Sequence, residues 1–549
     1  MDNQRLIFFI IFSFSILLLW DAWQKEHYPA QVIQQSKSAP VTVGGQKTPQ
    51  PSPSLSSGTG AISESKTEAL QSASRIKVQT DVFLAEIDTV GGDLRHLELV
   101  KHHDTDDKTK NFVLYEDKGP RTYIAQSGLI GDGLPTHKAI FNGKASTYKI
   151  AENEKQLEVK LDWSDAKGVT VEKIFTFHKD SYLIDVGYAI TNNSASRITP
   201  HAYYQLLRDG KAPNGDPKFI STYTGPAVYT DKEKFQKIDF SDIDKGKEKF
   251  AKYANDGWIA ILQHYFFSAW LPENNQPREF YTKKIGETYA AGVIVPVPAI
   301  EPGAKMSTKM ALYAGPQEQD NIVKLAPGLD LVVDYGMLTV IATPIFWVVQ
   351  LIHKLVQNWG IAIILLTVLI KMAFYPLSAK SYRSMAAMRV VSPKLQKLKE
   401  QYGDDRQRLH QAMMELYKTE KINPLGGCLP VVVQMPVFIA LYWVLLYSVE
   451  MRQAPFMAWI QDLSAPDPYY VLPIIMGITM IIQTKLNPTP PDPIQAKVMM
   501  IMPVAFSVFF FFFPAGLVLY WLVNNVLSIA QQWQVNRSVE HAKATKGHG

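Results

Sequence analysis

One lysine, Lys371, stands inside an apolar segment where a charge is costly. Residues 360–377 contain no other charged side chain. A cation near the centre of a bilayer costs about 2.5 kcal/mol or more, unless the amine snorkels or faces water. The neighbouring apolar segments carry no Asp or Glu at membrane depth, so they offer no internal ion pair. The counter-charge of Lys371 must therefore be water, lipid or a bound molecule.

Other polar side chains recur at spacings that bring them near this lysine. Thr367 precedes Lys371 by four residues on the same helical face, and Gln434 lies in a later apolar segment. The last apolar segment carries a polar stripe at steps of four, three and four, made of Trp521, Asn525, Ser528 and Gln532. Together these residues predict a hydrated groove open to the cytoplasm. The alternative is that Lys371 snorkels to the headgroups while the amides bond between helices.

Hydropathy predicts the helices that position these groups. A signal anchor is expected at 1–28, although a cleaved signal peptide remains an alternative. Residues 331–359 carry polar side chains at helical spacing and are expected to form an amphipathic helix in the interface. The membrane core, 360–535, is expected to contain spans at 360–377, 425–449, 471–486, 497–512 and 516–534, with a helical hairpin at 380–421.

The hairpin between the second and third spans sets the orientation. Residues 380–421 contain ten Lys or Arg against five acidic residues, which marks the cytoplasmic side. Six spans then leave both basic loops, the N-terminus and the short tail at 536–549 in the cytoplasm. The region between the first two spans is therefore predicted to be extracytoplasmic, and periplasmic in a double-membraned bacterium.

The region before the core is predicted to contain a disordered tether followed by a domain of strands. Residues 29–75 are rich in Pro, Ser, Gln and Gly and are predicted to be disordered. Within 76–330, the apolar residues of 157–163 and of 184–190 alternate with others at period two, which is typical of strands with one buried face. The predicted fold class is a polytopic α-helical membrane protein, with six spans and a five-helix core, that carries a large antiparallel β-sandwich.

Motifs for covalent or nucleotide chemistry are not found. The three Gly-Lys dipeptides continue into Ala145, Ala212 and Glu248, so none completes a phosphate-binding loop. The HHDTDD run at 102–107 is better explained as a solvated loop than as a metal site, because adjacent strand residues point to opposite faces. The single cysteine, Cys428, excludes an intrachain disulfide. The sequence therefore predicts no enzyme, no cofactor and no bound metal.

Short motifs in the membrane half together resemble the YidC/Oxa1/Alb3 insertases. The motifs are VDYG (333–336), NWG (358–360), YPL (375–377), the GDD turn of the hairpin, NPLGGCLPVVVQMPVF (423–438), MRQAPF (451–456), DLSAPDPYY (462–470) and FPAGLVLYW (513–521). The resemblance covers about 330–535. The anchor, tether and sandwich are similar to the arrangement in Gram-negative members, whose periplasmic domain is a β-supersandwich.

This resemblance implies a chaperone that inserts and helps to fold integral membrane proteins in the bacterial inner membrane, alone or with the Sec translocon. It implies that nascent chains meet a groove at Lys371, Thr367, Gln434, Trp521 and the adjacent Tyr520, to which the polar stripe adds Asn525. It also implies a hydrophobic slide at Phe438, Met476 and Phe509. The implied partners are nascent membrane proteins, membrane lipids, the Sec translocon and the ribosome, without recognition of a nucleic-acid sequence.

At position 371 the family commonly has Arg, so Lys371 keeps the charge but lacks the planar fork for bidentate binding. Two other functional classes remain as alternatives. A transporter or channel would be expected to show paired intramembrane charges or related halves, and neither is visible in the sequence. A periplasmic protein that binds or modifies carbohydrate would use the sandwich, and sugar binding by that domain would favour this class.

Overall fold

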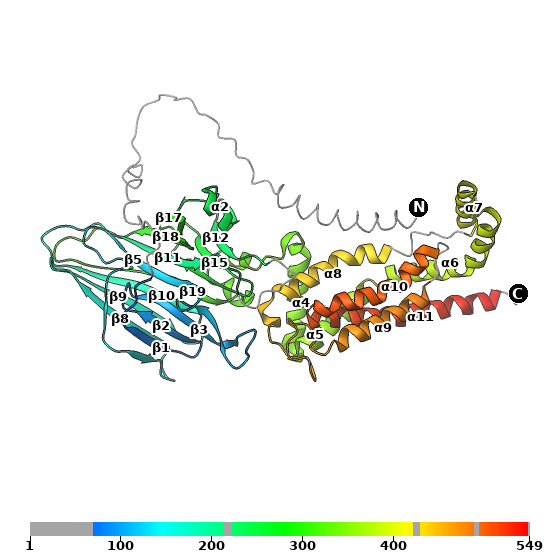
Figure 1. The fold of residues 1–549 in the computed structure, drawn as a ribbon, viewed down its shortest axis with the longest axis horizontal. Helices are drawn as coiled ribbons and strands as arrows, with labels where there is room; N and C mark the ends of the chain where they lie inside the picture. The colour runs from blue at the N-terminus through cyan, green and yellow to red at the C-terminus, as the bar shows by residue number, and fades with distance from the viewer. Residues whose placement is uncertain (1–69, 214–221, 404, 421–428, 488–492, 547–549) are drawn as a thin grey trace, which may run out of the picture.

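The computed structural model describes residues 70–213, 222–403, 405–420, 429–487 and 493–546. Within them the chain forms one half made of β-strands and one half made of helices, which extend away from the strands (Figure 1). The predicted anchor at 1–28, nearly all of the tether at 29–75, and Cys428 lie outside the described residues.

Two large sheets form the strand half, as predicted for an antiparallel sandwich. The ten-stranded sheet contains, in spatial order, β14 (Tyr253–Ala254), β17 (Arg278–Ile285), β18 (Thr288–Pro296), β11 (His201–Asp209), β5 (Tyr123–Ile130), β3 (Asp93–His103), β2 (Phe83–Asp88), β1 (Arg75–Gln79) and β7 (Thr147–Lys149), with β4 (Asn111–Tyr115) paired to β3. The nine-stranded sheet contains β13 (Lys234–Lys237), β12 (Gly225–Thr230), β15 (Trp258–Leu262), β16 (Phe266–Leu271), β19 (Lys305–Pro316), β10 (Leu183–Asn192), β9 (Val169–His178), β8 (Gln156–Ser164) and β6 (Asn142–Gly143). The described pairings are antiparallel apart from β1 with β7.

The period-two pattern of the sequence explains why the sheets face each other. On β10, Ile184, Val186, Tyr188 and Ile190 are all buried, while the register places Val186 opposite Phe175 of β9. These side chains join one apolar cluster between the two sheets. Because alternate residues of a strand point to opposite faces, one register serves the whole core.

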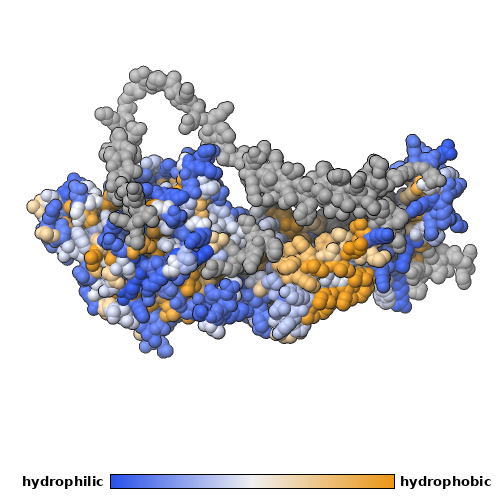
Figure 2. Space-filling view, viewed as in Figure 1, coloured by the Kyte–Doolittle hydropathy of each residue, from blue (hydrophilic) through white to orange (hydrophobic). Residues whose placement is uncertain are grey.

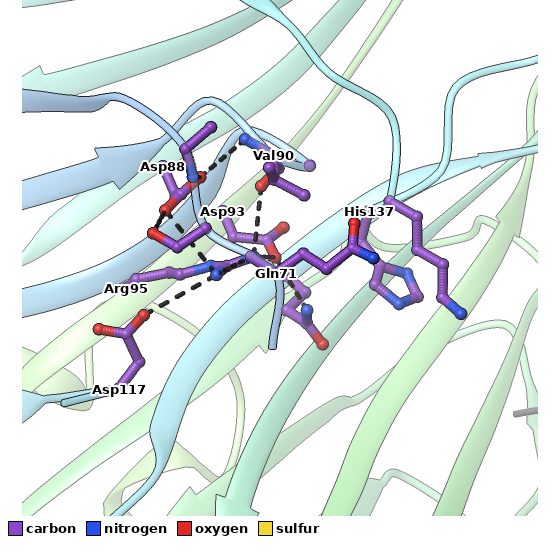
Figure 3. Close-up of polar contacts among 12 residues, drawn as sticks. Gln71, Asp88, Val90, Asp93, Arg95, Asp117 and His137 are labelled. Atoms are coloured by element: carbon purple, nitrogen blue, oxygen red, sulfur yellow. Dashed lines mark hydrogen bonds and ion pairs between the residues drawn. The ribbon is translucent and has the colours of Figure 1, made fainter. Parts of the chain in front are cut away.

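A buried ionic network fixes the place where the chain enters the sandwich (Figure 3). Arg95 donates a hydrogen bond to the carbonyl of Gln71 at 2.5 Å. Its guanidinium also lies 3.4 Å from Asp93 and 3.8 Å from both Asp88 and Asp117. The Arg95 side chain is only 2% exposed, so these carboxylates compensate a charge that would otherwise be very costly to bury.

The outer face of the nine-stranded sheet connects the sandwich to the helices. Side chains of β12, β15, β16 and β19 pack in one apolar cluster with residues of the connecting segment and of the helical half. That segment contains α3 (Gln319–Ile322) and the short 3₁₀ helices η2 (Leu329–Val332) and η3 (Gly336–Leu338). The Trp258 indole donates to the carbonyl of Pro327 at 3.0 Å. The His264 ring bonds the carbonyl of Leu446 at 2.9 Å. The two halves therefore share a packed and hydrogen-bonded contact.

Helices and short 3₁₀ turns make up the second half. They are α4 (Thr339–Val356), α5 (Trp359–Ala373), α6 (Tyr375–Tyr402), α7 (Arg406–Thr419), α8 (Leu429–Tyr447), η5 (Val449–Met451), α9 (Val471–Leu486), α10 (Pro493–Phe509), η6 (Phe510–Phe512) and α11 (Ala515–Lys546). The short helix α2 (Phe240–Lys245) belongs to the sandwich. The bounds of α9 coincide with the predicted span at 471–486.

Several boundaries differ from the predicted ones. The helix expected over 360–377 ends at Ala373, and α6 continues after a bend of 67°. Pro376 explains the break, because in a continuous helix its ring would clash with the carbonyl four residues earlier. The stretch 536–546, predicted as a tail, extends α11 as a helix. The beginning of the predicted span at 425–449 lies outside the described residues, and α8 starts at Leu429.

Length and composition alone give an incomplete picture of the membrane helices. In the described part of the chain, α4 alone passes as a candidate span, and α5 with α6 passes as a bent pair. Shorter apolar helices lie at Val433–Tyr447, Val471–Leu486 and Ala496–Phe512. The interfacial position of α4 stays a prediction, since its length would also allow it to cross a bilayer.

The exposed side chains of the helical half indicate its surroundings. Figure 2 shows an apolar surface over the helices, with hydrophilic surfaces over the sandwich and the far end. Large apolar side chains are exposed on α5, α9 and α10, among them Leu365, Ile478, Met500, Ile501 and Val508. A soluble monomer rarely exposes so continuous an apolar surface, whereas lipid requires it.

Candidate functional site

A cavity of about 300 Å³, lined by both polar and apolar side chains, lies among the helices. Five helices supply its walls. The lining residues are Lys371 of α5; Ser378, Ser381, Tyr382 and Met385 of α6; Gln434, Met435 and Phe438 of α8; Met480, Gln483, Thr484 and Asn487 of α9 and its end; and Tyr520, Trp521, Asn524, Asn525 and Ser528 of α11. The cavity brings together six of the nine site residues that the sequence predicted.

Lys371 reaches this cavity from the last turn of α5. Its amine donates to the Ser528 hydroxyl at 2.7 Å. That hydroxyl in turn donates to the carbonyl of Asn524 at 2.7 Å. No Asp or Glu lines the cavity among the residues that the structure describes. The cation is thus held by a neutral acceptor, and an anion entering the cavity would meet no resident competitor.

The bend after α5 changes the predicted depth of the lysine. The sequence placed Lys371 about six residues before the end of its span, but the helix ends two residues after it, at Ala373. The carbonyl end of a helix carries partial negative charge, which favours a nearby cation. The bend also carries the start of α6 across the cavity, so that Ser378, Ser381 and Tyr382 join the wall.

Amide groups form another part of the wall. Gln434 donates to the side-chain oxygen of Asn524 at 2.6 Å and lies 3.4 Å from the hydroxyl of Tyr520. Asn525 lies 3.4 Å from the hydroxyl of Thr479 on α9. These contacts tie α8 and α9 to α11 and keep polar atoms at the cavity surface.

An aromatic cluster closes one end of the cavity. The rings of Phe438 and Trp521 meet edge to face with centroids 4.5 Å apart. Phe510 lies 5.4 Å from Trp521 on the far side. The Trp521 indole N–H is buried and has no hydrogen-bond partner among the described residues. A buried donor without a partner is rare and costly.

Thr367, Met476 and Phe509 are the predicted site residues that do not line this cavity. Thr367 is fully buried, and its hydroxyl donates to the carbonyl of Ile363 within α5 at 2.7 Å. Met476 is also fully buried, in the apolar cluster of the helices, whereas Phe509 is 54% exposed on α10. The three residues of the predicted slide therefore lie in three different environments, and in this conformation Met476 offers no contact surface.

Sequence reasoning missed several wall residues. Ser378, Ser381, Tyr382 and Met385 follow at steps of three, one and three, so they share one face of α6. This periodicity was available in the sequence, but the basic residues between them indicated only a hairpin. Gln483, Thr484 and Asn487 show the same spacing at the end of α9.

Apolar side chains separate the cavity from the sandwich side of the membrane. The buried cluster of the helical half includes Ile363, Leu366, Leu441, Val444, Leu517 and Val518. All six are at most 2% exposed. They lie earlier on α5 and α11, and later on α8, than the polar residues that line the cavity. The cavity is therefore a notch that ends against a packed layer, as expected for a groove open on one side.

Comparisons with known proteins identify the family of this arrangement. Residues 75–348 match the YidC periplasmic domain, and residues 351–543 match the 60Kd inner membrane protein family. The chain is 59% identical over 550 residues to the membrane protein insertase YidC of Methylobacillus flagellatus, covering 100% of this chain and 99% of that protein. It is 55% identical to that of Nitrosospira multiformis, covering 99% of this chain and 98% of that protein.

Two solved structures are similar over most of the chain at lower identity. The crystal structure of an active YidC insertase with its first transmembrane domain resolved has a TM-score of 0.41 at 18% identity, covering 84% of this chain and 92% of that one. YidC from Thermotoga maritima has a TM-score of 0.35 at 15% identity, covering 84% and 98%. The full-length sequence matches decide the assignment: the chain belongs to the YidC family of membrane protein insertases, inner-membrane proteins with a large periplasmic domain.

Proposed function

We propose that the cavity beside Lys371 receives the polar flank of a client while the client's apolar segment enters the lipid. Membrane protein insertion is the function of the family to which the chain belongs. The observation that supports this role for the cavity is the amine of Lys371 held by Ser528 without an acidic neighbour in the wall. A client carboxylate would supply the missing negative charge.

The energetics of insertion fit a cavity of this kind. Apolar residues near the centre of a span each favour insertion by about 0.3–0.6 kcal/mol, so a whole apolar segment enters the lipid favourably. The barrier is the transfer of the polar flank. A notch lined by amides, hydroxyls and one cation shortens the apolar distance that this flank has to cross. No nucleotide or covalent step is required.

The apolar part of the wall suits the other part of a client. Met385, Met435, Phe438 and Met480 line the same cavity as the polar groups. Methionine side chains are flexible and polarisable, so they adapt to segments of different shape. A client can therefore be held by its flank and by the beginning of its apolar segment at once.

Further partners are proposed on the basis of charge and position. The basic hairpin of α6 and α7 is a candidate surface for the ribosome, whose RNA is strongly anionic. The Sec translocon is a candidate partner for clients with long translocated regions. Membrane lipids are expected to contact the exposed apolar side chains of α5, α9 and α10.

The charge of Lys371 can be tested in cells depleted of their own insertase. The depleted cells receive the wild-type chain, Lys371→Arg or Lys371→Glu, and insertion of a small client with an acidic translocated flank is followed by protease accessibility. We expect Lys371→Arg to support insertion and Lys371→Glu to impair it, because Glu repels the acidic flank. A client with an uncharged flank serves as the control. Equal insertion of the acidic client by both variants at equal protein levels would show that the charge at position 371 has no role in insertion.

A further inference from the structure

The loop between α8 and α9, residues 448–470, lies where three of the cavity helices begin. The helices α5, α9 and α11 each start beside this loop. The first turn of a helix has N–H groups without acceptors inside the helix. For α5 the acceptor is a side chain that itself binds the loop. For α9 and α11 the acceptors are groups of the loop.

Asn358 links the start of α5 to the loop. Its side-chain oxygen accepts from the backbone N–H of Ile361 at 3.0 Å, which caps the helix. Its side-chain nitrogen donates to the carbonyl of Phe456 in the loop at 2.8 Å. Gly360, two residues after Asn358, leaves room for the Phe456 ring: a Cβ there would lie 2.0 Å from Cδ2 and 2.4 Å from Cγ of the ring. The ring therefore rests directly on the backbone of α5.

Asp467 caps α9 from within the loop. Its carboxylate accepts from the backbone N–H of Leu472 at 2.8 Å and from that of Tyr469 at 3.0 Å. It also accepts from the indole of Trp459 at 3.0 Å. Asp467 is only 1% exposed, so it fixes the path of the loop as well as the helix end.

The start of α11 is bound by loop carbonyls. The backbone N–H of Ala515 donates to Ala465 at 2.8 Å, and that of Gly516 donates to Leu463 at 2.9 Å. A bridge between Pro466 and Pro514 continues this pairing. The helix that carries Ser528 is thus fastened to the same loop as the helix that carries Lys371.

The sandwich holds this loop from the other side. Arg452 donates to the carbonyl of His103 at 2.6 Å and to the hydroxyl of Thr105 at 3.1 Å. Its guanidinium lies 5.4 Å from the ring centroids of both Phe112 and Phe266. Gln453 adds hydrogen bonds to the carbonyls of His103 and Asp104 at 3.2 and 3.0 Å. The loop is therefore anchored to the sandwich at one end and to the helices at the other.

We propose that this loop sets the axial position of α5 relative to α11, with Phe456 on Gly360 as the contact that fixes it. The proposal rests on the function proposed for Lys371. The helix α5 runs without a break from Trp359 to Ala373, and backbone hydrogen bonds join each turn of a helix to the next. A displacement at Gly360 therefore reaches Lys371 and changes the level at which its amine meets Ser528. Phe456 and Gly360 act as positioning residues.

A double-mutant cycle tests this contact. Gly360→Ala pushes against the ring, Phe456→Gly removes the ring together with its Cβ, which would lie 2.8 Å from the new methyl group, and the double variant therefore relieves the whole clash. Insertion is measured for two clients that differ only in the charge of the translocated flank, acidic or uncharged. The readout is the insertion efficiency of the acidic client divided by that of the uncharged client, because a general loss of stability would lower both efficiencies together.

We expect Gly360→Ala to lower the ratio by about threefold or more, within the range that coupled neighbours show in such cycles. The double variant should recover most of this loss. The matched control is Ile361→Ala on the same turn, whose side chain is 41% exposed, and it should leave the ratio unchanged. An unchanged ratio in Gly360→Ala, or no recovery in the double variant, would overturn the proposal.

A second measurement needs no client, and so separates this proposal from the function proposed above. Spin labels at Met372 and Val526, which are 57% and 49% exposed, report the distance between α5 and α11 in a Cys428→Ser background. We expect Gly360→Ala to shift this distance and the double variant to reverse the shift. An unshifted distance contradicts the positioning role, whatever the outcome for Lys371→Glu.

Discussion

Lys371 combines three features that together make its position tolerable. It lies in the last turn of α5, where the helix end favours a cation. It donates to Ser528, and the cavity beside it has polar walls. The same features leave the cation without a carboxylate among the described wall residues, so its charge is available to a visitor.

Ser528 offers a graded test of how that amine is held. Ser528→Ala removes the hydroxyl that accepts from Lys371 but leaves the charge and the cavity in place. We expect a smaller loss of acidic-client insertion than Lys371→Glu causes, because the charge remains and water in the cavity can replace part of the about 1.5–3 kcal/mol that a hydrogen bond to a charged group contributes. Insertion of the acidic client is measured beside Ser538→Ala, an exposed serine later on α11. A loss as large as that of Lys371→Glu would show that Ser528 has a role beyond holding the amine.

Glu450 makes the contact between the loop and the connecting segment at α3 sensitive to pH. Burial raises the pKa of this carboxyl to about 7, and the charges of Glu318 and Asp320 add to the effect, while the backbone N–H of Gln319 opposes it. In the folded protein the Glu450 carboxyl thus keeps its proton up to about pH 7, whereas in the unfolded chain it loses the proton near the ordinary pKa of 4.5. Its contribution to stability is therefore full below pH 4.5 and is lost as pH rises through 7.

Glu450→Gln should remove this dependence, since the amide stays neutral at every pH. We expect the variant to gain thermal stability relative to the wild type as pH rises from about 5 to about 7, with a constant difference above that. The measurement is the unfolding midpoint of the purified full chain in detergent across this range. Parallel profiles for the two proteins would mean that the Glu450 carboxyl is not buried as a neutral group.

At the scale of elements, the hydrophobic pattern predicted the segments in which a single periodicity or a single apolar run extends over the whole element. The strands at 157–163 and 184–190 and the helix at 471–486 were predictable, because period-two alternation indicates a strand and an apolar run of this length indicates a helix. The end of α5 was not, since residues 374–377 continue the apolar run and only the proline marks the break. The wall residues of α6 were missed because the basic residues between them indicated only a hairpin.

The contacts inside the site were beyond reach of the sequence for a different reason. Spacing along one helix showed that Asn525 and Ser528 share a face, but it could not show which of them meets Lys371 across 157 residues of chain. Nor could it separate Thr367, which bonds its own helix, from residues that line the cavity. Pairing between helices depends on tertiary packing that no local pattern specifies.

The packing of α9 against α10 gives a prediction at this scale. A Cβ at Gly477 would lie 2.7 Å from the hydroxyl oxygen of Ser507, so a larger side chain must push the two helices apart. We expect Gly477→Leu to destabilise the protein by about 1–3 kcal/mol, the usual cost of overpacking. Protein level and thermal stability in detergent are compared with Ile478→Leu at an exposed neighbouring position. Equal stability of the two variants would mean that α9 and α10 can separate freely.

At the scale of the whole molecule, the sandwich and the helices are linked by few but specific contacts. Arg452 is central, because it bonds the turn after β3 and lies over two aromatic rings. Arg452→Lys keeps the charge but loses the planar fork, and Arg452→Ala loses both. With one spin label on each half, we expect the distribution of label-to-label distances to broaden in both variants, more so in Arg452→Ala.

Arg197→Ala is the matched control for this measurement. Its partner is Glu301, and both side chains are at least 60% exposed within the sandwich. An exposed pair of this kind contributes little to stability, so its loss should leave the distance between the halves unchanged. A distribution in Arg452→Ala as narrow as in the wild type would show that the remaining contacts, among them His264 with Leu446, suffice to hold the two halves together.

The apolar layer that ends the cavity has a further consequence for the cell. Leu366, Val444 and Val518 are nearly inaccessible, so the notch gives ions and protons no continuous watery path. A bilayer perforated at each insertion event would discharge the gradient that powers the cell. Here a client has to leave sideways into the lipid, and the membrane can stay electrically tight while new proteins enter it.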